Sequence, residues 1–303
     1  MLGLFKKRLK PIWQFHKPNG LIWRALFLDP HYLIGEFRER GARKVSFFLL
    51  DTETGKLIWD NFVLIDTAAK PVGDGWWVGM ETVYRGLVLF HGYYSPNVPE
   101  HLGIWAFDPL TKTLRWVRPD VSYLCIVDDQ LLAVRNVLVD GYAERAFLSL
   151  NPLTGEAIED FGQNTAAVNA LRERAPNLLE EQNITLPEHI TEQSPNYAIV
   201  AKQAQMQTGA ARVVAGFDVL TYQGKTILGY HEQTAQWVTN QAGLRVQALN
   251  YKLFVLDEKQ AIIYEDILGA QMSGLLVDGF FMRQNRLYYV KETNMLCAVE
   301  LFS

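Results

Sequence analysis

Short apolar runs separated by polar turns recur along the chain. In the clearest copies an apolar run ends in Asp or Asn, a polar turn follows, and a second apolar run begins. These copies lie at residues 47–59, 104–116 and 147–159. Asp or Asn at the start of a turn accepts hydrogen bonds from backbone N–H groups further along, and Gly permits a positive φ. Each copy therefore predicts a β-hairpin.

Four further copies extend the repeat toward both ends of the chain. Residues 252–264 align with residues 286–298 without a gap, at an offset of 34 residues, and residues 219–228 lie a similar distance upstream. Residues 12–23 provide a seventh, N-terminal copy. Other β-prone runs lie between the hairpins, at residues 32–37, 87–90, 131–134 and 275–277. Several strands per repeat are therefore expected.

This pattern predicts an all-β fold and, within that class, a β-propeller. Runs such as residues 47–50 are apolar on both faces, as expected of a strand that lies between two neighbouring sheets. Small four-stranded sheets stacked around an axis cover each other's faces in this way. Seven copies over 303 residues give about 43 residues each, within the range of propeller blades. We expect a single β-propeller domain over residues 1–303, with seven blades, or six if the two ends complete a shared blade.

One segment departs from the β pattern. In residues 162–195, residues 164–165 offer a helix cap, and Val168 and Leu171 follow on one helical face. Pro176 then ends or restarts the helix. The sequence predicts one or two short helices inserted between blades, which either pack on the propeller rim or dock a partner.

The first three hairpins resemble the repeat of quinoprotein-like (PQQ-repeat-like) β-propellers. In that repeat a strand ends in Asp, a Thr-Gly-Lys type of turn follows, and the next strand carries Trp. Residues 51–59 match this pattern well. Residues 108–116 have Lys112 in place of the glycine, and residues 151–159 have Glu159 in place of the tryptophan. The resemblance implies a β-propeller of an uncharacterised bacterial family.

The resemblance does not imply the quinone chemistry of that family. Quinone-dependent dehydrogenases are much longer chains, and many of them carry adjacent cysteines beside the cofactor. Cys125 and Cys297 lie far apart in this sequence, each inside an apolar run. We expect them to be reduced core thiols in the cytoplasm, and we expect no cofactor.

Composition and charge narrow the classes of function. Hydrophobic residues make up 49% of the chain and charged residues 20%, which is typical of a globular protein and excludes a disordered chain. The formal net charge of −4 provides no positive field of the kind that nucleic-acid binding needs. No nucleic-acid partner is therefore expected.

The N-terminal residues carry a basic cluster made of Lys6, Lys7, Arg8 and Lys10. Apolar residues precede these charges and no apolar stretch of secretory-signal length accompanies them, so export is not expected. No run approaches the roughly 18 uninterrupted apolar residues that span a bilayer. The cluster predicts a solvated tail, and a membrane-surface assembly factor that uses these four residues is the alternative.

The candidate site lies between the hairpins at residues 47–59 and 104–116, where the repeat lengthens to 57 residues. We expect an extra loop in residues 76–101, and loops on rigid scaffolds often carry function. Its aromatic and charged side chains are of the types that line a pocket for a small polar ligand. The candidate ligand-binding residues are Trp76, Trp77, Glu81, Arg85, His91, Tyr93, Tyr94 and His101. The alternative is that the aromatic residues only pack within a blade, beneath an exposed loop.

The histidines predict no metal site. His91 and His101 lie ten residues apart without a Cys/His pair nearby, which fits no usual zinc pattern. The other four histidines are scattered along the chain and suggest no group: His16, His31, His189 and His231. No serine-hydrolase, zinc-protease, P-loop or dinucleotide-binding motif occurs either.

Residues 36–44 form a charged stretch between two predicted strands. Acidic and basic side chains are mixed in it, which predicts a solvated turn. A site for a small anion, made by Arg38, Arg40 and Arg43, is the alternative.

Taken together, these features favour a non-catalytic, cytoplasmic β-propeller that binds a protein partner or a small polar ligand. An enzyme of hydrolase or lyase type, with a site assembled from residues 76–101, is the second hypothesis. Convergence of Glu81, Arg85, His91 and His101 in one cleft is the observation that would favour the enzyme.

Overall fold

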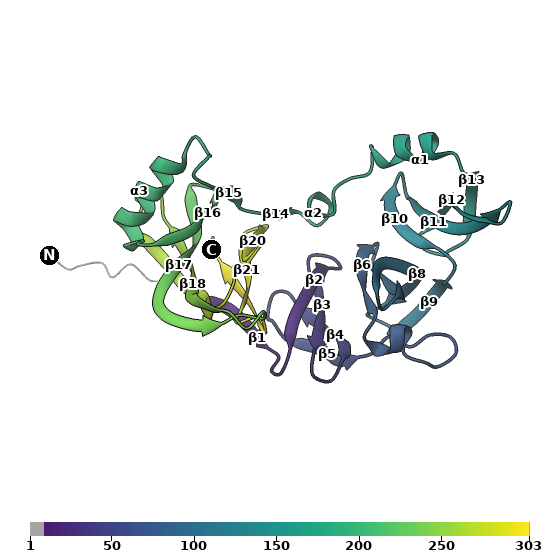
Figure 1. Ribbon diagram of the computed structural model, residues 1–303, viewed down its shortest axis with the longest axis horizontal. Coiled ribbons are helices and arrows are strands. Elements are labelled where there is room, and N and C mark those ends of the chain that lie inside the picture. The colour runs from purple at the N-terminus through teal and green to yellow at the C-terminus, as the bar shows by residue number, and fades with distance from the viewer. Residues whose placement is uncertain (1–8, 303) are drawn as a thin grey trace. The chain divides into compact units, whose positions relative to one another are not determined.

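A computed structural model describes residues 9–302, and over these residues the chain is all-β (Figure 1). Its strands form five antiparallel sheets of four or five strands each. The chain divides into two compact units. We call residues 19–182 the central unit, and residues 9–18 together with 183–302 the terminal unit. Three residues of the basic cluster, Lys6, Lys7 and Arg8, lie outside the described residues.

The central unit contains three sheets, each built from four strands that pair in the order of the chain. The first consists of β2 (Leu21–Phe27), β3 (Tyr32–Glu39), β4 (Lys44–Asp51) and β5 (Leu57–Phe62). The second consists of β6 (Val78–Tyr84), β7 (Leu87–Ser95), β8 (Val98–Asp108) and β9 (Thr113–Arg118), after the short helix η1 (Val72–Gly75). The third consists of β10 (Ser122–Val127), β11 (Gln130–Val139), β12 (Tyr142–Leu150) and β13 (Ala157–Gly162). Four strands joined by successive hairpins are the topology of a propeller blade.

The terminal unit contains two five-stranded sheets. One consists of β15 (Glu188–Ile190), β16 (Val213–Tyr222), β17 (Lys225–Thr239), β18 (Arg245–Leu256) and β19 (Ile262–Met272), in that order. The other has the order β1 (Pro11–His16), β22 (Met295–Glu300), β21 (Arg286–Lys291), β20 (Phe280–Arg283) and β14 (Ile184–Thr185). Because β1 pairs with β22, strands from the two ends of the chain complete one sheet, as the sequence predicted.

Five sheets occur in the described residues, against the seven or six that the hairpin count predicted. Six of the seven predicted hairpins are present, but those at residues 219–228 and 252–264 belong to the same sheet. Residues 12–23 are not a hairpin, since β1 and β2 lie in different sheets. The pattern marks any antiparallel hairpin, and a four-stranded blade contains three of them. The single-domain organisation over residues 1–303 stays a prediction.

The predicted helices are present in the 162–195 segment, together with the short strands β14 and β15. Asn164 caps α1 (Thr165–Arg172) by accepting a hydrogen bond from Ala167 N at 3.1 Å. A second short helix, α2 (Leu178–Glu181), follows. The longest helix, α3 (Tyr197–Thr208), lies beyond the predicted segment. Within residues 9–302, the structure contains no helix with the length and apolar character that crossing a membrane requires.

The turn chemistry expected from the sequence is present in all three quinoprotein-like hairpins. Oδ1 of Asp51 accepts hydrogen bonds from the backbone N–H groups of the turn that follows it, and Asp108 and Asn151 do the same. Lys112, which replaces the glycine of the motif, adopts a φ of 56°. The second turn therefore keeps the left-handed conformation at the glycine position, although a side chain is disfavoured there.

The tryptophan of each of the first two hairpins joins one sheet to the next. Trp59 on β5 donates from Nε1 to the carbonyl of Pro109 at 2.9 Å, and Trp116 on β9 donates to the carbonyl of Pro152 at 3.1 Å. Both rings are less than 10% exposed. A Cβ on Gly155 would lie 2.7 Å from the ring of Trp116, so the glycine of the third turn lets this turn close on the ring.

Apolar side chains fill the spaces between consecutive sheets of the central unit. Phe47 on β4 and Phe90 on β7 meet edge to face with centroids 4.6 Å apart, and both are fully buried.

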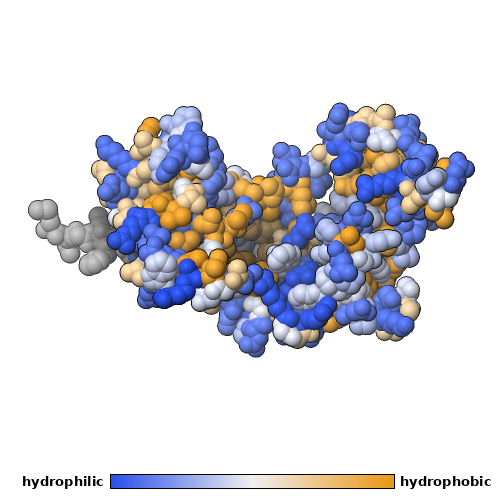
Figure 2. Space-filling view, in the orientation of Figure 1, coloured by the Kyte–Doolittle hydropathy of each residue, from blue (hydrophilic) through white to orange (hydrophobic). Residues whose placement is uncertain are grey.

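Hydrophilic residues cover much of the face seen in Figure 2, with apolar residues interspersed. Among the exposed apolar residues are Leu275 and Val277. Residues 275–277 were predicted as strand but lie in a loop, because their short apolar run has no strand partner.

We expect Trp116→Ala to lower the free energy of unfolding by about 3–5 kcal/mol, because both the packing of the ring and its hydrogen bond are lost. Trp116→Phe keeps most of the packing and should cost about 1–2 kcal/mol. Urea unfolding measures both effects. Glu159→Ala is the matched control, since exposed Glu159 occupies the equivalent position in the third hairpin. A loss with Trp116→Ala no larger than that of the control would show that the ring does not join the sheets.

Candidate functional site

Most of the predicted site residues lie on the second sheet of the central unit. Glu81 lies on β6, His91 and Tyr93 lie on β7, and His101 lies on β8. Tyr93 pairs directly with His101 across the two strands. The ten residues that separate the two histidines in sequence are therefore the length of one hairpin, which brings the two side chains together.

Two register shifts adjust the side chains of this sheet. The pairing of β6 with β7 shifts at Glu81, and the pairing of β7 with β8 shifts at His91. A bulge places an extra residue in one strand and re-aims the neighbouring side chains. Without these irregularities, strict alternation would send successive side chains of β6 to opposite faces.

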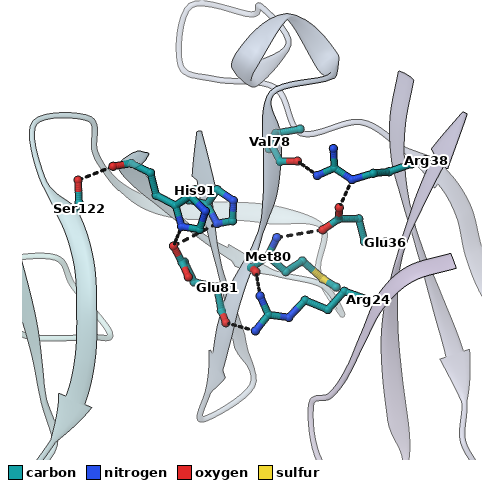
Figure 3. Close-up of polar contacts among 9 residues, drawn as sticks. Arg24, Glu36, Arg38, Val78, Met80, Glu81, His91 and Ser122 are labelled. Carbon is teal, nitrogen blue, oxygen red and sulfur yellow. Dashed lines mark hydrogen bonds and ion pairs between the residues drawn. The ribbon is translucent and has the colours of Figure 1, made fainter. Parts of the chain in front are cut away.

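Glu81, His91 and His101 converge on one point, and we call these three residues the Glu–His–His cluster (Figure 3). Glu81 Oε1 shares a short hydrogen bond with Nδ1 of His101 and lies 3.1 Å from Nδ1 of His91. The two imidazole rings are stacked, with centroids 3.4 Å apart and planes inclined by 7°. The three ligand-type atoms lie within 4.8 Å of one another. Sequence spacing predicted no such group, because it could not include the strand pairing.

Burial and the contacts within the cluster together set the protonation states of Glu81 and His91. Burial opposes ionisation of Glu81, but the contacts with His101 and His91 outweigh it and lower the pKa of the carboxyl group to about 2. Burial also lowers the pKa of His91, although the nearby carboxylate of Glu81 acts in the opposite direction. An ionised carboxylate therefore faces a neutral imidazole at neutral pH.

Aromatic side chains surround the cluster on one side. The ring of Tyr93 meets the rings of His91 and His101 edge to face, each at a centroid distance of 5.3 Å. Trp77 packs on Tyr93 at 5.7 Å, and Trp76 packs on Trp77 at 6.4 Å. Tyr93 and Trp77 thus extend the three-residue cluster into a group of five predicted residues. Trp76 is joined to this group through Trp77.

The two remaining predicted residues lie elsewhere. Arg85 forms an exposed ion pair with Asp129, at 2.8 Å, and is not part of the cluster. Tyr94 is 57% exposed and lines a pocket beside His101. Three of the four residues that the enzyme hypothesis required to converge therefore do so, and Arg85 is the exception.

The pocket beside the cluster has a volume of about 290 Å³. Sequence analysis did not identify most of its residues, because β10, β11 and β12 contribute them. Its polar lining comprises Tyr94, Glu100, His101, Ser122, Tyr123, Arg135, Asn136 and Arg145. Ser122 Oγ donates to the carbonyl of His101 at 2.6 Å and so connects β10 to the cluster (Figure 3).

A buried ion pair supports the cluster from the first sheet. Arg38 Nε donates to Glu36 Oε1 at 2.6 Å, and the side chains are 11% and 1% exposed. Glu36 Oε2 accepts from Met80 N, and Arg38 donates to the carbonyl of Val78, so both side chains cover the free edge of β6 (Figure 3). The predicted solvated turn is thus confined to exposed residues 40–44. Glu36 and Arg38 belong instead to β3, which places them beside the next sheet.

A second group of polar side chains in the terminal unit was also missed. Nδ1 of His189 lies 2.7 Å from Oδ1 of Asp218, and Tyr251 donates to the other oxygen of Asp218 at 2.6 Å. Nε2 of His231 accepts a hydrogen bond from Leu276 N at 2.8 Å. His189, Asp218 and His231 line a pocket of about 190 Å³. His189 and His231, scattered in sequence, are brought together by β15 and β17.

Residues 28–116 match the family model described as Domain of unknown function (DUF4905). The matched region begins directly after β2, ends within β9 and includes the Glu–His–His cluster. No curated protein matches the chain.

Solved structures resemble the chain over most of its length at low identity. The Dos1 propeller is 11% identical, with a TM-score of 0.35, and the match covers 97% of this chain and 96% of that one. MPT-4, a mannose phosphorylase from Leishmania mexicana, is 13% identical with a TM-score of 0.28, and the match covers 97% and 88%. The β-propeller domain of the Trilobed protease from Pyrococcus furiosus is 8% identical with a TM-score of 0.28, and the match covers 90% and 64%. The strand order within the sheets of the central unit is itself that of propeller blades.

Loss of the buried carboxylate should destabilise the central unit. We expect Glu36→Ala to lower the free energy of unfolding by about 3–5 kcal/mol, because it leaves the Arg38 guanidinium buried without its partner. The double variant Glu36→Met/Arg38→Met should recover much of this loss. Arg174→Ala removes an ion pair whose two side chains are more than half exposed, and should have a much smaller effect in the same urea titration. Equal losses for Glu36→Ala and Arg174→Ala would contradict the assignment.

Stability should also depend on His231 at acidic pH. Burial lowers the pKa of His231 despite the opposing charge of Asp218, so the folded chain keeps it neutral while the unfolded chain takes up a proton below about pH 6.5. Its contribution is therefore complete above about pH 6.5 and decreases as the pH falls. Urea unfolding of the wild type and His231→Gln at about pH 7.5 and 5.5 tests this. The variant should lose less stability on acidification, and an equal loss would count against the role of His231.

Proposed function

We propose that this protein is a non-catalytic β-propeller that binds a small polar ligand in the pocket beside the Glu–His–His cluster. The observation that carries the proposal is the convergence of three side chains from three strands at the edge of that pocket. Polar groups that converge on a pocket, together with a carboxyl group of shifted pKa, are typical of a binding site.

The charges around the pocket favour an anion. Arg135 and Arg145 contribute two guanidinium groups, against the single carboxylate of Glu100. Arg145 and Glu100 form only a loose, exposed pair at 3.6 Å. Nε of Arg135 is buried without a hydrogen-bond partner, although its NH2 group pairs with Asp160. Guanidinium groups bind carboxylates and phosphates with paired hydrogen bonds, so we propose a ligand that carries one of these groups.

The volume of the pocket limits the size of the ligand. Pockets for drug-sized ligands span about 300–1,000 Å³, and this one lies at the lower limit of that range. Ser122, Asn136 and Tyr94 offer neutral donors and acceptors beside the guanidinium groups. A small metabolite with one or two acidic groups fits this lining better than a large or apolar molecule.

The quinoprotein-like hairpins have a structural part in this proposal. Trp59 and Trp116, which make up the resemblance, join neighbouring sheets and do not contribute to the pocket. We therefore propose that the chain shares the architecture of that repeat and uses it as a scaffold for a different site.

A protein partner is the second candidate. The tip of the β11–β12 hairpin exposes Leu138 and Tyr142, which are 79% and 74% exposed. Exposed large apolar side chains at a loop tip favour contact with another protein over contact with a small ion. This tip is separate from the residues that line the pocket, so the two candidates can be tested independently.

Isothermal titration with succinate and with inorganic phosphate tests the anion site. We expect at least one of the two anions to bind, and we expect Arg135→Ala and Arg145→Ala each to weaken binding about tenfold or more. Arg172→Ala, which removes an exposed arginine from α1, should leave the affinity unchanged, and so should Leu138→Ser. If neither anion binds, or if the pocket variants bind like the wild type, the proposed anion site is wrong and the protein-partner candidate takes its place.

A further inference from the structure

The Glu–His–His cluster presents one carboxylate oxygen and two imidazole nitrogens to a common point. Two histidines and one carboxylate are the donor set of catalytic zinc sites and of mononuclear Fe(II) sites. From this convergence we propose that Glu81, His91 and His101 bind a divalent first-row transition-metal ion, with Zn²⁺ as the reference. The proposal goes beyond the anion site and does not depend on it.

The distances within the cluster suit a single ion. Ligand atoms that surround Zn²⁺ tetrahedrally at about 2.0–2.1 Å lie about 3.3 Å from one another. Glu81 Oε1 and His91 Nδ1 are 3.1 Å apart, and all three ligand atoms lie within 4.8 Å of one another. Bringing them to a common ion therefore requires adjustment of side chains and no movement of the strands.

The stacked rings must open when the ion binds. The Nδ1 lone pairs of two parallel imidazoles lie in two separate parallel planes, whereas ligands of one ion must point at the same centre. His91 is held by burial, with its side chain only 5% exposed, but the side chain of His101 is 35% exposed and borders the pocket. We therefore expect His101 to turn toward the ion and His91 to stay in place.

The bonding state of His91 supports a ligand at this point. Neither ring nitrogen of His91 makes a hydrogen bond, although both are buried. The 3.1 Å contact between Nδ1 and Glu81 Oε1 lies outside hydrogen-bond geometry. Buried polar atoms nearly always have a partner, and an ion between Glu81 and His91 would provide one for Nδ1.

The ring of His91 packs closely against the backbone of Gly79. A Cβ on Gly79 would lie 2.8 Å from Nε2 of His91 and 3.4 Å from Oε2 of Glu36. The absence of a side chain at position 79 thus makes room for the ring on β7 and for the buried carboxylate behind it. Gly79→Ala should displace the imidazole without removing any ligand atom.

Three protein ligands leave a coordination position for a further group. Catalytic zinc sites use this fourth position for water or substrate. Since His101 and Ser122 both line the pocket, the open position would face the space where we propose that an anion binds. An anion in the pocket and a cation at the cluster would then strengthen each other's binding.

Metal titration of the full chain tests the proposal. After dialysis against EDTA and then against metal-free buffer, Zn²⁺ is titrated by calorimetry and Co²⁺ by visible absorption. We expect one equivalent of each ion to bind, with the intense d–d bands of a four-coordinate Co²⁺ ion. Glu81→Gln and His101→Ala should each lower the affinity for Zn²⁺ at least about tenfold, and Gly79→Ala should lower it with all three ligands retained.

Matched controls separate a specific site from general metal binding. His189→Ala removes a half-exposed histidine that also lies beside a carboxylate, and it should leave the affinity and the Co²⁺ spectrum unchanged. Thermal unfolding in EDTA identifies any variant that fails to fold, and His101→Ala, at a partly exposed position, is the variant least affected in this way. Absence of stoichiometric binding, or equal binding by the wild type, Glu81→Gln and His101→Ala, overturns the proposal.

The same samples distinguish the metal site from the anion site. Succinate and phosphate titrations of the EDTA-treated chain report on the anion site alone. Anion binding without metal binding would leave the anion site standing and reject the metal site, and the reverse result would do the opposite. Stronger anion binding by the Zn²⁺-loaded chain is the result expected if both sites exist.

Discussion

The central unit depends on the coverage of sheets that are apolar on both faces. No sheet of this kind can be stable in water by itself, so each requires a neighbouring sheet. The tryptophans that join the sheets determine how neighbouring sheets meet. Trp59 and Trp116 combine a large buried ring with one directed hydrogen bond to the next turn. Burial alone has no preferred direction, whereas the indole N–H selects one carbonyl and so defines the position of the next sheet.

The candidate site coincides with departures from that regularity. The strand pairing shifts at Glu81 on β6, and it shifts again where β8 passes His91, so both irregularities lie beside the three converging side chains. The free edge of β6 is meanwhile covered by Glu36 and Arg38 from the first sheet. The site is therefore held by two sheets, although its ligand-type side chains come from one. The candidate site thus lies where the sheet is irregular and where the neighbouring sheet covers its edge.

Local sequence features predicted the fold well. Asp51, Asp108 and Asn151 act through backbone groups two or three residues away, so their effect could be inferred without knowledge of the rest of the chain. The count of sheets failed because a hairpin pattern does not state which strands of a sheet it joins. The pairing of Glu81 with two histidines depends on register, and the burial of Arg38 depends on a neighbouring sheet. Neither is encoded in the residues next to them.

The third quinoprotein-like hairpin lacks the tryptophan that the first two hairpins carry. Glu159 occupies the position of Trp59 and Trp116, is exposed, and belongs to the last sheet of the central unit. The three sheets of the central unit have two junctions between them, and one tryptophan lies at each junction. The number of tryptophans thus follows the number of sheet-to-sheet contacts and not the number of sheets. Adding a fourth sheet by duplication would therefore also require a tryptophan at position 159, where the third sheet would meet the new one.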